Sequence, residues 1–227
     1  MDYRARQRMA AGSTWLCLVT SYWLAALPLS AQPAQTPEAV IAALRTALDN
    51  NDLAAVALHL TGETGRTLRQ LAVPFAQCQR AYEQLLRAAK EKGLTLATPL
   101  DRTLRPFDGF ECTLVGEPIR DKDTFRARIR CGPRGKTREE TVIVLQEEGR
   151  WRLTAPEVLV RMTPTAARAP AVTRLYEELA RVLERLAKQV AEGQIENRQA
   201  FLTAFALHVA PLVEALERPS AGTGSGR

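Results

Sequence analysis

The sequence has few of the residues from which most catalytic and metal sites are built. Its 227 residues include two histidines and four cysteines, and aromatic residues make up 6% of the chain. It contains no CxxC pair, HExxH, GxSxG, P-loop or dinucleotide-binding fingerprint. From these absences we predict no catalytic residue, no metal site and no cofactor. The shortage of aromatic rings also disfavours a base-stacking platform for single-stranded nucleic acid.

Hydrophobic residues, in contrast, are abundant enough to build a core. They make up 46% of the chain, which excludes wholesale disorder. The length of 227 residues allows one ordinary domain, or one domain with an appendage. The formal net charge is +6.

The first 31 residues have the layout of a secretory signal. Arg4, Arg6 and Arg8 precede an apolar stretch from Trp15 to Leu29, and small residues follow, ending at Ala31. This order predicts a signal peptide over residues 1–31, cleaved after Ala31, and an exported protein in the periplasm or outside the cell. After cleavage we expect no membrane contact. The alternative is an uncleaved anchor that tethers the protein to the membrane.

Removal of this segment lowers the charge of the mature chain. The segment holds three arginines and one aspartate, so the remaining 196 residues carry a net charge of +4. A small excess spread over that length is a weak sign of nucleic-acid binding, and export weakens it further. We therefore expect no nucleic-acid partner.

Export would also place three cysteines in an oxidising compartment. Cys112 and Cys131 flank a polar stretch, and their midpoint falls between Asp121 and Lys122. A turn centred there would place the two cysteines across from each other, and a secreted setting favours a disulfide between them. The alternative is two buried free thiols. Cys78 lies in a helical pattern and is expected to be a small buried apolar residue.

The spacing of apolar residues predicts an α+β fold, with N-terminal helices packed on a curled antiparallel sheet and a helical hairpin after it. Helical spacing begins at Pro37, pauses at residues 50–52, resumes over 53–60, and returns over 67–92 after Gly62 and Gly65 break the chain. Pro74 is expected to kink or split the third helix.

Alternation of apolar and polar residues then predicts strands, joined by short turns into a four-stranded meander. The strand patterns lie at 110–114, 124–131, 141–145 and 150–153. Together with the helices they define a domain over residues 37–160. Residues 154–170 are expected to be a linker with a short ordered piece at 158–160.

The C-terminal part returns to helical spacing. A long helix is predicted over 171–192, and Asn197 caps a last helix that Pro211 kinks, which makes a hairpin over 170–217. Residues 218–227 are rich in glycine and serine and are predicted to be a disordered tail.

Two segments resemble nuclear transport factor two-like domains. The stretch from Thr36 to Ala55 is similar to their first helix pair. The stretch from Thr141 to Leu153, in which a glycine turn precedes Trp151, is similar to their closing hairpin. Secreted bacterial members, largely of unknown function, are the nearest in pattern. The resemblance implies a cone-shaped half-barrel wrapped by helices, often with a pocket and often dimeric.

The sequence departs from the enzymatic members of that family. Those members place an aspartate with a histidine or tyrosine inside the cone, whereas the only histidine within residues 37–160 is His59. We therefore transfer no catalytic residue. Asp101, Asp108 and Glu111 precede or begin the first strand and could line a cone mouth, with ordinary loop charges as the alternative.

The most distinctive feature is a set of five arginines on alternating strand positions, which is predicted to bind an anionic small ligand: Arg126, Arg128, Arg130, Arg150 and Arg152. Guanidinium groups suit carboxylates and phosphates because they donate paired hydrogen bonds. The alternative is a solvated sheet face whose charge is offset by acidic residues.

Taken together, these features favour an exported, non-catalytic binding or interaction domain whose partner is a protein or an anionic small ligand. One alternative is a small-molecule hydrolase or isomerase of the same cone-like class that uses His59 or a pocket aspartate. The other is a membrane-tethered assembly factor whose hairpin mediates oligomers. A homodimer is compatible with any of these.

Overall fold

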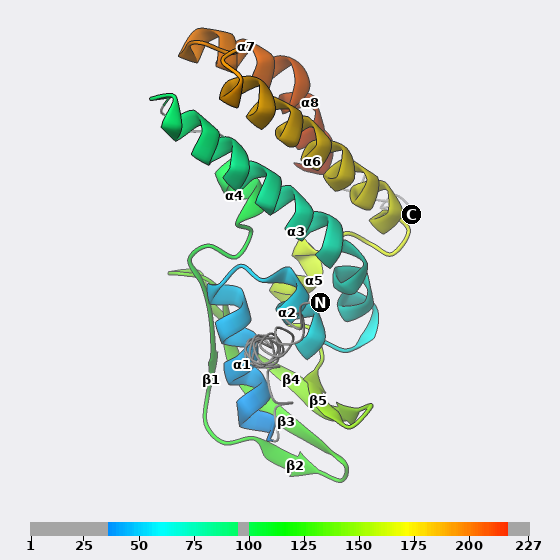
Figure 1. Ribbon diagram of the computed structural model, residues 1–227. Helices are drawn as coiled ribbons and strands as arrows, with labels where there is room; N and C mark the ends of the chain where they lie inside the picture. The colour runs from blue at the N-terminus through cyan, green and yellow to red at the C-terminus, as the bar shows by residue number, and fades with distance from the viewer. Residues whose placement is uncertain (1–35, 95–99, 218–227) are drawn as a thin grey trace, which may run out of the picture. The chain divides into compact units, whose positions relative to one another are not determined.

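The computed structural model describes residues 36–94 and 100–217, which belong to one compact unit. The predicted signal peptide (1–31) and the predicted disordered tail (218–227) lie outside these residues. The fold class is confirmed: helices come first, followed by a curled antiparallel half-barrel sheet and then further helices (Figure 1).

Within the described residues, the helices and strands are grouped along the chain: four helices, then five strands, then four helices. The N-terminal helices are α1 (Pro37–Asp49), α2 (Leu53–His59), α3 (Gly62–Glu91) and the short α4 (Leu100–Leu104). The strands are β1 (Phe110–Leu114), β2 (Ile119–Asp121), β3 (Thr124–Pro133), β4 (Arg138–Glu147) and β5 (Arg150–Leu153). The remaining helices are α5 (Glu157–Met162), α6 (Ala169–Ala191), α7 (Arg198–His208) and α8 (Ala210–Glu217).

Polar caps begin the helices where the sequence predicts them. The Thr36 hydroxyl accepts a hydrogen bond from the Ala39 amide at 3.2 Å, and Asp52 accepts one from the Ala55 amide at 2.9 Å. Each cap satisfies an amide that has no partner inside its own helix. The start of α1 and the break before α2 therefore follow from local sequence.

The third helix differs from the prediction, because Gly65 does not break it and Pro74 does not split it in two. It runs unbroken for 30 residues, and Gly65 lies inside its first turns. Pro74 removes one backbone hydrogen bond, but it is buried among apolar residues that continue on both sides, such as Leu71 and Phe75. Packing of this apolar stripe along the whole helix outweighs the local cost.

The sheet has five strands rather than four. Its order is β1-β3-β4-β5, and β2 also pairs with β3. The predicted register holds, since Cys112 lies opposite Cys131. In the β2–β3 pair Ile119 lies opposite Arg126, a register shifted by two residues, and the segment 115–118 between the strands absorbs the shift. That extra segment makes β2 a separate short strand.

One face of the sheet forms the core with α1 and α2. Strands β3 and β4 contribute Ala127, Ile129, Val142 and Val144, which are almost completely buried. The apolar stripes of α1 and α2 pack into the same core. The tight turn at Glu148–Gly149, where both residues have positive φ, returns the chain into β5.

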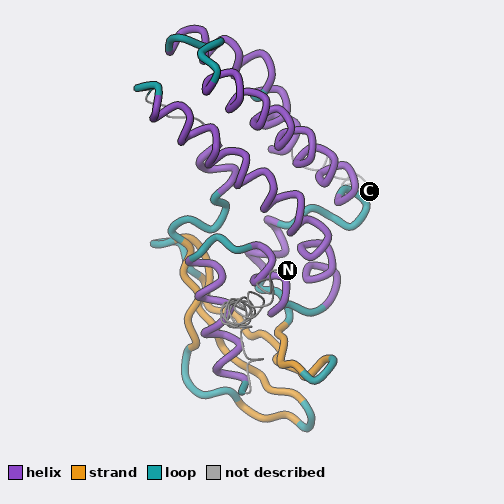
Figure 2. The backbone as a smooth tube through the Cα atoms, in the orientation of Figure 1, coloured by secondary structure: helices purple, strands orange, loops and turns teal. Residues whose placement is uncertain are grey.

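The C-terminal helices form the predicted hairpin, and it packs against the rest of the unit. Helix α6 runs alongside α3 in the same direction, and α7 and α8 turn back (Figures 1 and 2). The ring centroids of Phe75 on α3 and Tyr176 on α6 lie 5.4 Å apart in an edge-to-face contact. The chain before this hairpin, predicted as a linker, holds helix α5.

The buried positions along α3, which packs against α6, are separated by alternating intervals of three and four residues. On α3 they are Leu68, Leu71, Phe75, Cys78, Tyr82, Leu85 and Ala89. This is the spacing of a coiled-coil seam, in which side chains of one helix fit between those of another.

The last helix is broken as its proline predicts. Asn197 caps α7 by accepting a hydrogen bond from Ala200, and the chain bends by 44° before α8, which has Pro211 in its first turn. Within the described ranges no single helix is long and apolar enough to span a membrane, whereas α7 and α8 taken together meet those limits as a bent pair.

Candidate functional site

The five arginines of the predicted site lie on one face of the sheet. In the register, Arg128 lies opposite Thr141, Arg152 opposite Leu145 and Arg150 opposite Glu147. Residues 141, 145 and 147 alternate with the buried Val142 and Val144 of β4 and so point away from the core. The sequence pattern therefore identifies the face correctly.

Acidic neighbours occupy three of these arginines. Arg126 pairs with Asp121 at 2.7 Å and Arg130 with Glu139 at 2.5 Å. The Arg130 guanidinium lowers the pKa of Glu139 by hydrogen bonding to it. Both pairs are exposed and contribute little to stability, but they take up guanidinium hydrogen bonds that a ligand would need.

Arg152 is a structural residue rather than a surface one. It is only 7% exposed and donates to Glu147 at 2.5 Å and to Glu148 at 3.0 Å. Glu147 also accepts a hydrogen bond from Thr61, next to the start of α3. Arg152 therefore holds the β4–β5 hairpin against the α2–α3 connection.

The two remaining arginines are too far apart to share a small ligand. Within the described part of the chain, Arg128 and Arg150 form no ion pair. Their partners on β4, Thr141 and Glu147, lie six residues apart, which corresponds to roughly 20 Å along a strand. The arginine face thus offers separated charges rather than one convergent anion site.

The two core cysteines lie across from each other as predicted. Cys112 and Cys131 are almost completely buried. The structure holds both as free thiols, as it does Cys78 on α3. The predicted register is therefore correct, and the disulfide itself stays a prediction.

His59 is not positioned for acid–base work. It ends α2, is half-buried, and desolvation lowers its pKa. It forms no hydrogen bond or ion pair with another described residue, so no carboxylate orients it. Within the same ranges no three metal-binding side chains cluster.

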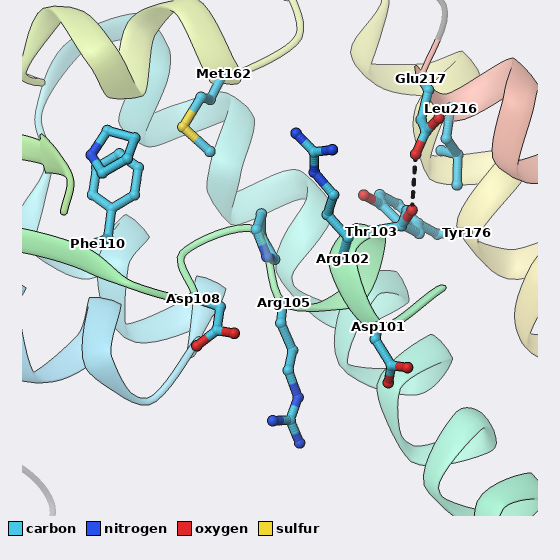
Figure 3. Close-up of a pocket in the computed structure, with 12 residues that line it drawn as sticks. Asp101, Arg102, Thr103, Arg105, Asp108, Phe110, Met162, Tyr176, Leu216 and Glu217 are labelled. Carbon is cyan, nitrogen blue, oxygen red and sulfur yellow. Dashed lines mark hydrogen bonds between the residues drawn. The ribbon is translucent and has the colours of Figure 1, made fainter. Parts of the chain in front are cut away.

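The described unit has a polar cleft of about 960 Å³ (Figure 3). One wall is α4 and the loop after it. The other walls are the start of β1, the end of β3, the end of α5, and helices α6 and α8. Its lining comprises Asp101, Arg102, Thr103, Arg105, Pro106, Asp108, Phe110, Pro133, Met162, Tyr176, Leu216 and Glu217.

Several polar groups of this cleft already have partners. The Tyr82 hydroxyl donates to Asp101 at 3.0 Å, and the Thr103 hydroxyl donates to Glu217 at 3.2 Å. The second bond ties α4 to the end of α8, 114 residues further along the chain. These contacts fix the position of the cleft wall.

Four other polar side chains of the cleft, those of Arg102, Arg105, Asp108 and Tyr176, form no hydrogen bond or ion pair with a described residue. The Arg102 guanidinium forms no ion pair, and the Tyr176 hydroxyl forms no hydrogen bond. Burial raises the pKa of Tyr176, so its hydroxyl remains protonated and can donate. In Figure 3 the Arg102 side chain points toward the side of Met162 and Glu217, whereas Asp101, Arg105 and Asp108 point the opposite way.

The structure thus separates the three acidic residues that the sequence placed near a cone mouth. Asp101 and Asp108 line the cleft, whereas Glu111 pairs with Arg134 at 2.9 Å. Sequence reasoning missed Arg102 and Tyr176. They lie 74 positions apart in the chain, and no local pattern links them.

Comparison with known proteins supplies no relative: no family model, curated protein or solved structure matches this chain.

Proposed function

We propose that the described unit is a non-catalytic binding domain whose ligand is a small organic molecule with a carboxylate or phosphate group and an apolar part. The observation that carries this proposal is that two donors of the cleft, the exposed Arg102 guanidinium and the half-buried Tyr176 hydroxyl, have no partner among the described residues. Donors in a cleft that have no protein partner can form hydrogen bonds to a ligand that binds there.

The rest of the cleft suits the apolar part of such a ligand. Phe110, Met162 and Leu216 line it, and Met162 is 43% exposed. A volume of about 960 Å³ lies at the upper end of the range of small-molecule sites. An apolar wall with a few placed polar groups is the usual composition of these sites.

The lining of the cleft has three carboxylates and two guanidiniums, so its total charge does not favour an anion. An anionic ligand group must therefore bind where a guanidinium is separated from the carboxylates. Asp101 and Asp108 point away from Arg102 (Figure 3), and Glu217 is occupied by Thr103. We therefore place the anionic group of the ligand at Arg102 and Tyr176, where paired guanidinium hydrogen bonds recognise a carboxylate or phosphate.

We expect Arg102→Gln to weaken binding of the amphipathic anion 8-anilinonaphthalene-1-sulfonate roughly tenfold, because it removes a charge-assisted hydrogen bond. Fluorescence titration at constant ionic strength measures the change. Arg128→Gln, which removes one of the two arginines of the sheet face that form no ion pair with a described residue, is the matched control and should leave the affinity unchanged. A loss of binding in Arg128→Gln, with Arg102→Gln unaffected, would move the site to the arginine face and refute the cleft.

The enzyme alternative has less support from the structure. His59 lies outside the cleft, and the aspartates that line it are exposed. An acid–base mechanism would need a carboxyl group whose pKa is shifted by a buried or charged setting. We therefore prefer binding over turnover as the role of this site.

Export is part of the proposal, and what supports it is the n-region, apolar stretch and small residues of the first 31 positions. N-terminal sequencing of the protein recovered from an exporting cell should begin at Gln32. Recovery of the chain with residues 1–31 attached to the membrane fraction would instead favour the tethered assembly factor.

A relationship to nuclear transport factor two-like domains is likewise a proposal. Its support is the order of α1 and α2 before a curled sheet, together with the Gly149 turn before Trp151. Trp151 packs edge-to-face on Phe125 with ring centroids 5.4 Å apart. Under this relationship the cleft corresponds to the pocket that the resemblance implies, and homodimerisation remains an expectation.

A further inference from the structure

The backbone hydrogen bonds of the β1–β3 pair define how Cys112 and Cys131 face each other. The Val115 amide donates to the Arg128 carbonyl at 2.8 Å, and the Arg134 amide donates to the Gly109 carbonyl at 2.8 Å. Both bonds belong to hydrogen-bonded pairs of the antiparallel ladder, and such pairs alternate along it. The pairs 115/128, 113/130, 111/132 and 109/134 are therefore the hydrogen-bonded ones. Cys112 and Cys131 lie between two of them and form a non-hydrogen-bonded pair.

That pair type brings opposing side chains closest. Opposite Cα atoms lie about 4.5 Å apart in non-hydrogen-bonded pairs, against about 5.5 Å in hydrogen-bonded ones. Disulfides bridge Cα atoms about 4.4–6.8 Å apart. The neighbouring Cys112 thiol raises the pKa of Cys131. The two strands need little movement to accept a bond.

Among the described cysteines, Cys112 and Cys131 have each other as the one candidate partner. Cys112 is 1% exposed and Cys131 is 2% exposed, so neither meets an external thiol in the folded protein. Cys78 lies on α3, where its thiol neighbours Tyr176. Pairing within β1–β3 is thus the one choice that the folded chain favours.

We propose that Cys112 and Cys131 are joined by a cross-strand disulfide when the chain folds in the presence of a disulfide oxidant. The two thiols lose two protons and two electrons as the S–S bond forms, and the oxidant's disulfide takes them up and becomes two thiols. Because burial blocks attack on the folded protein, the exchange takes place before β1 and β3 close. The inference rests on the strand pairing and is independent of the proposed ligand site.

The bond would fasten one wall of the cleft. Phe110 and Pro133 lie opposite each other two residues along the same strands, and both line the cleft. The disulfide closes a loop with 18 residues between the cysteines. A loop of this size restricts the unfolded chain enough to raise the melting temperature by roughly 6–12 °C in a chain of this length.

The test refolds the full chain carrying Cys17→Ser in glutathione redox buffer, alkylates free thiols, and maps the peptides. We expect Cys112 and Cys131 in one linked peptide pair, two hydrogens lighter than the separate peptides, and Cys78 alkylated. Alkylation of all three cysteines, or a bond that includes Cys78, would overturn the proposal.

A melting experiment checks the same bond independently. Dithiothreitol added before unfolding should lower the melting temperature of the Cys17→Ser chain by roughly 6–12 °C. The effect should persist in Cys78→Ala and vanish in the double variant Cys112→Ala with Cys131→Ala. If the double variant does not fold, the peptide map of the parent chain decides alone. A reductant effect that survives in a folded double variant would contradict the proposal.

Discussion

Replacing Phe201 with alanine is expected to lower the free energy of unfolding by about 3–5 kcal/mol. Phe201 lies on α7, is fully buried, and stacks at 5.9 Å on Phe205. Its removal leaves a cavity on the inner side of the C-terminal hairpin, which cannot collapse because α6 is packed along α3. Urea unfolding followed by circular dichroism measures the change.

The neighbouring residue provides the control. Leu202 follows Phe201 on α7 and is 41% exposed, so Leu202→Ala should change stability by less than about 1 kcal/mol. We also expect one cooperative transition in both variants, because the α3–α6 contact couples the hairpin to the sheet. A separate early transition in Phe201→Ala would mean instead that the hairpin folds as an independent appendage.

Replacing Gly65 with alanine is expected to cost about 3 kcal/mol or more, although alanine favours helices over glycine. A Cβ at this position would lie 2.3 Å from the Leu60 carbonyl oxygen and 2.8 Å from its carbon. Leu60 cannot retreat easily, since it bridges to Leu153 and the next amide, that of Thr61, bonds to the Leu153 carbonyl at 3.0 Å. The added methyl group therefore strains the joint between α2, α3 and β5.

Gly135→Ala separates this clash from ordinary glycine effects. Gly135 has a φ of +76° and open space around it, so alanine there meets only backbone strain of about 1–2 kcal/mol. Thermal unfolding of the two variants at one pH gives the comparison. Equal losses in Gly65→Ala and Gly135→Ala would show that the close approach to Leu60 is not what requires glycine.

Much of the secondary structure was predictable because its causes are local. Thr36, Asp52 and Asn197 begin helices through side-chain bonds to amides three residues ahead. Alternation along β3 identifies its buried face. The polar turn near residues 121–124 sets the register of β2 on β3, and the segment 115–118 shifts that register by two residues, so that Cys112 lies opposite Cys131. Each of these features involves residues close in the chain or directly across one turn.

Where the structure differs from the sequence pattern, the cause is a contact between two secondary-structure elements. Gly65 has the appearance of a helix breaker in the sequence, but it lies within α3, and glycine is required there because the backbone of Leu60 passes too close for a side chain. The arginine face has less free charge than its spacing suggests, since Asp121 and Glu139 from other strands pair with two of its members. Acidic residues that offset the arginine charge are the alternative that the sequence leaves open, but the spacing of the arginines does not show which acidic residue pairs with which arginine.

Sequence alone therefore determined the class of fold and the capped helix starts, because backbone geometry and short-range hydrogen bonds specify them. Only the tertiary structure decided where ligand chemistry gathers. Arg102 and Tyr176 meet in one cleft because α6 packs along α3 and α8 returns to α4, where Thr103 bonds to Glu217. That convergence is a result of core packing between helices far apart in the chain, which no periodicity in the sequence encodes.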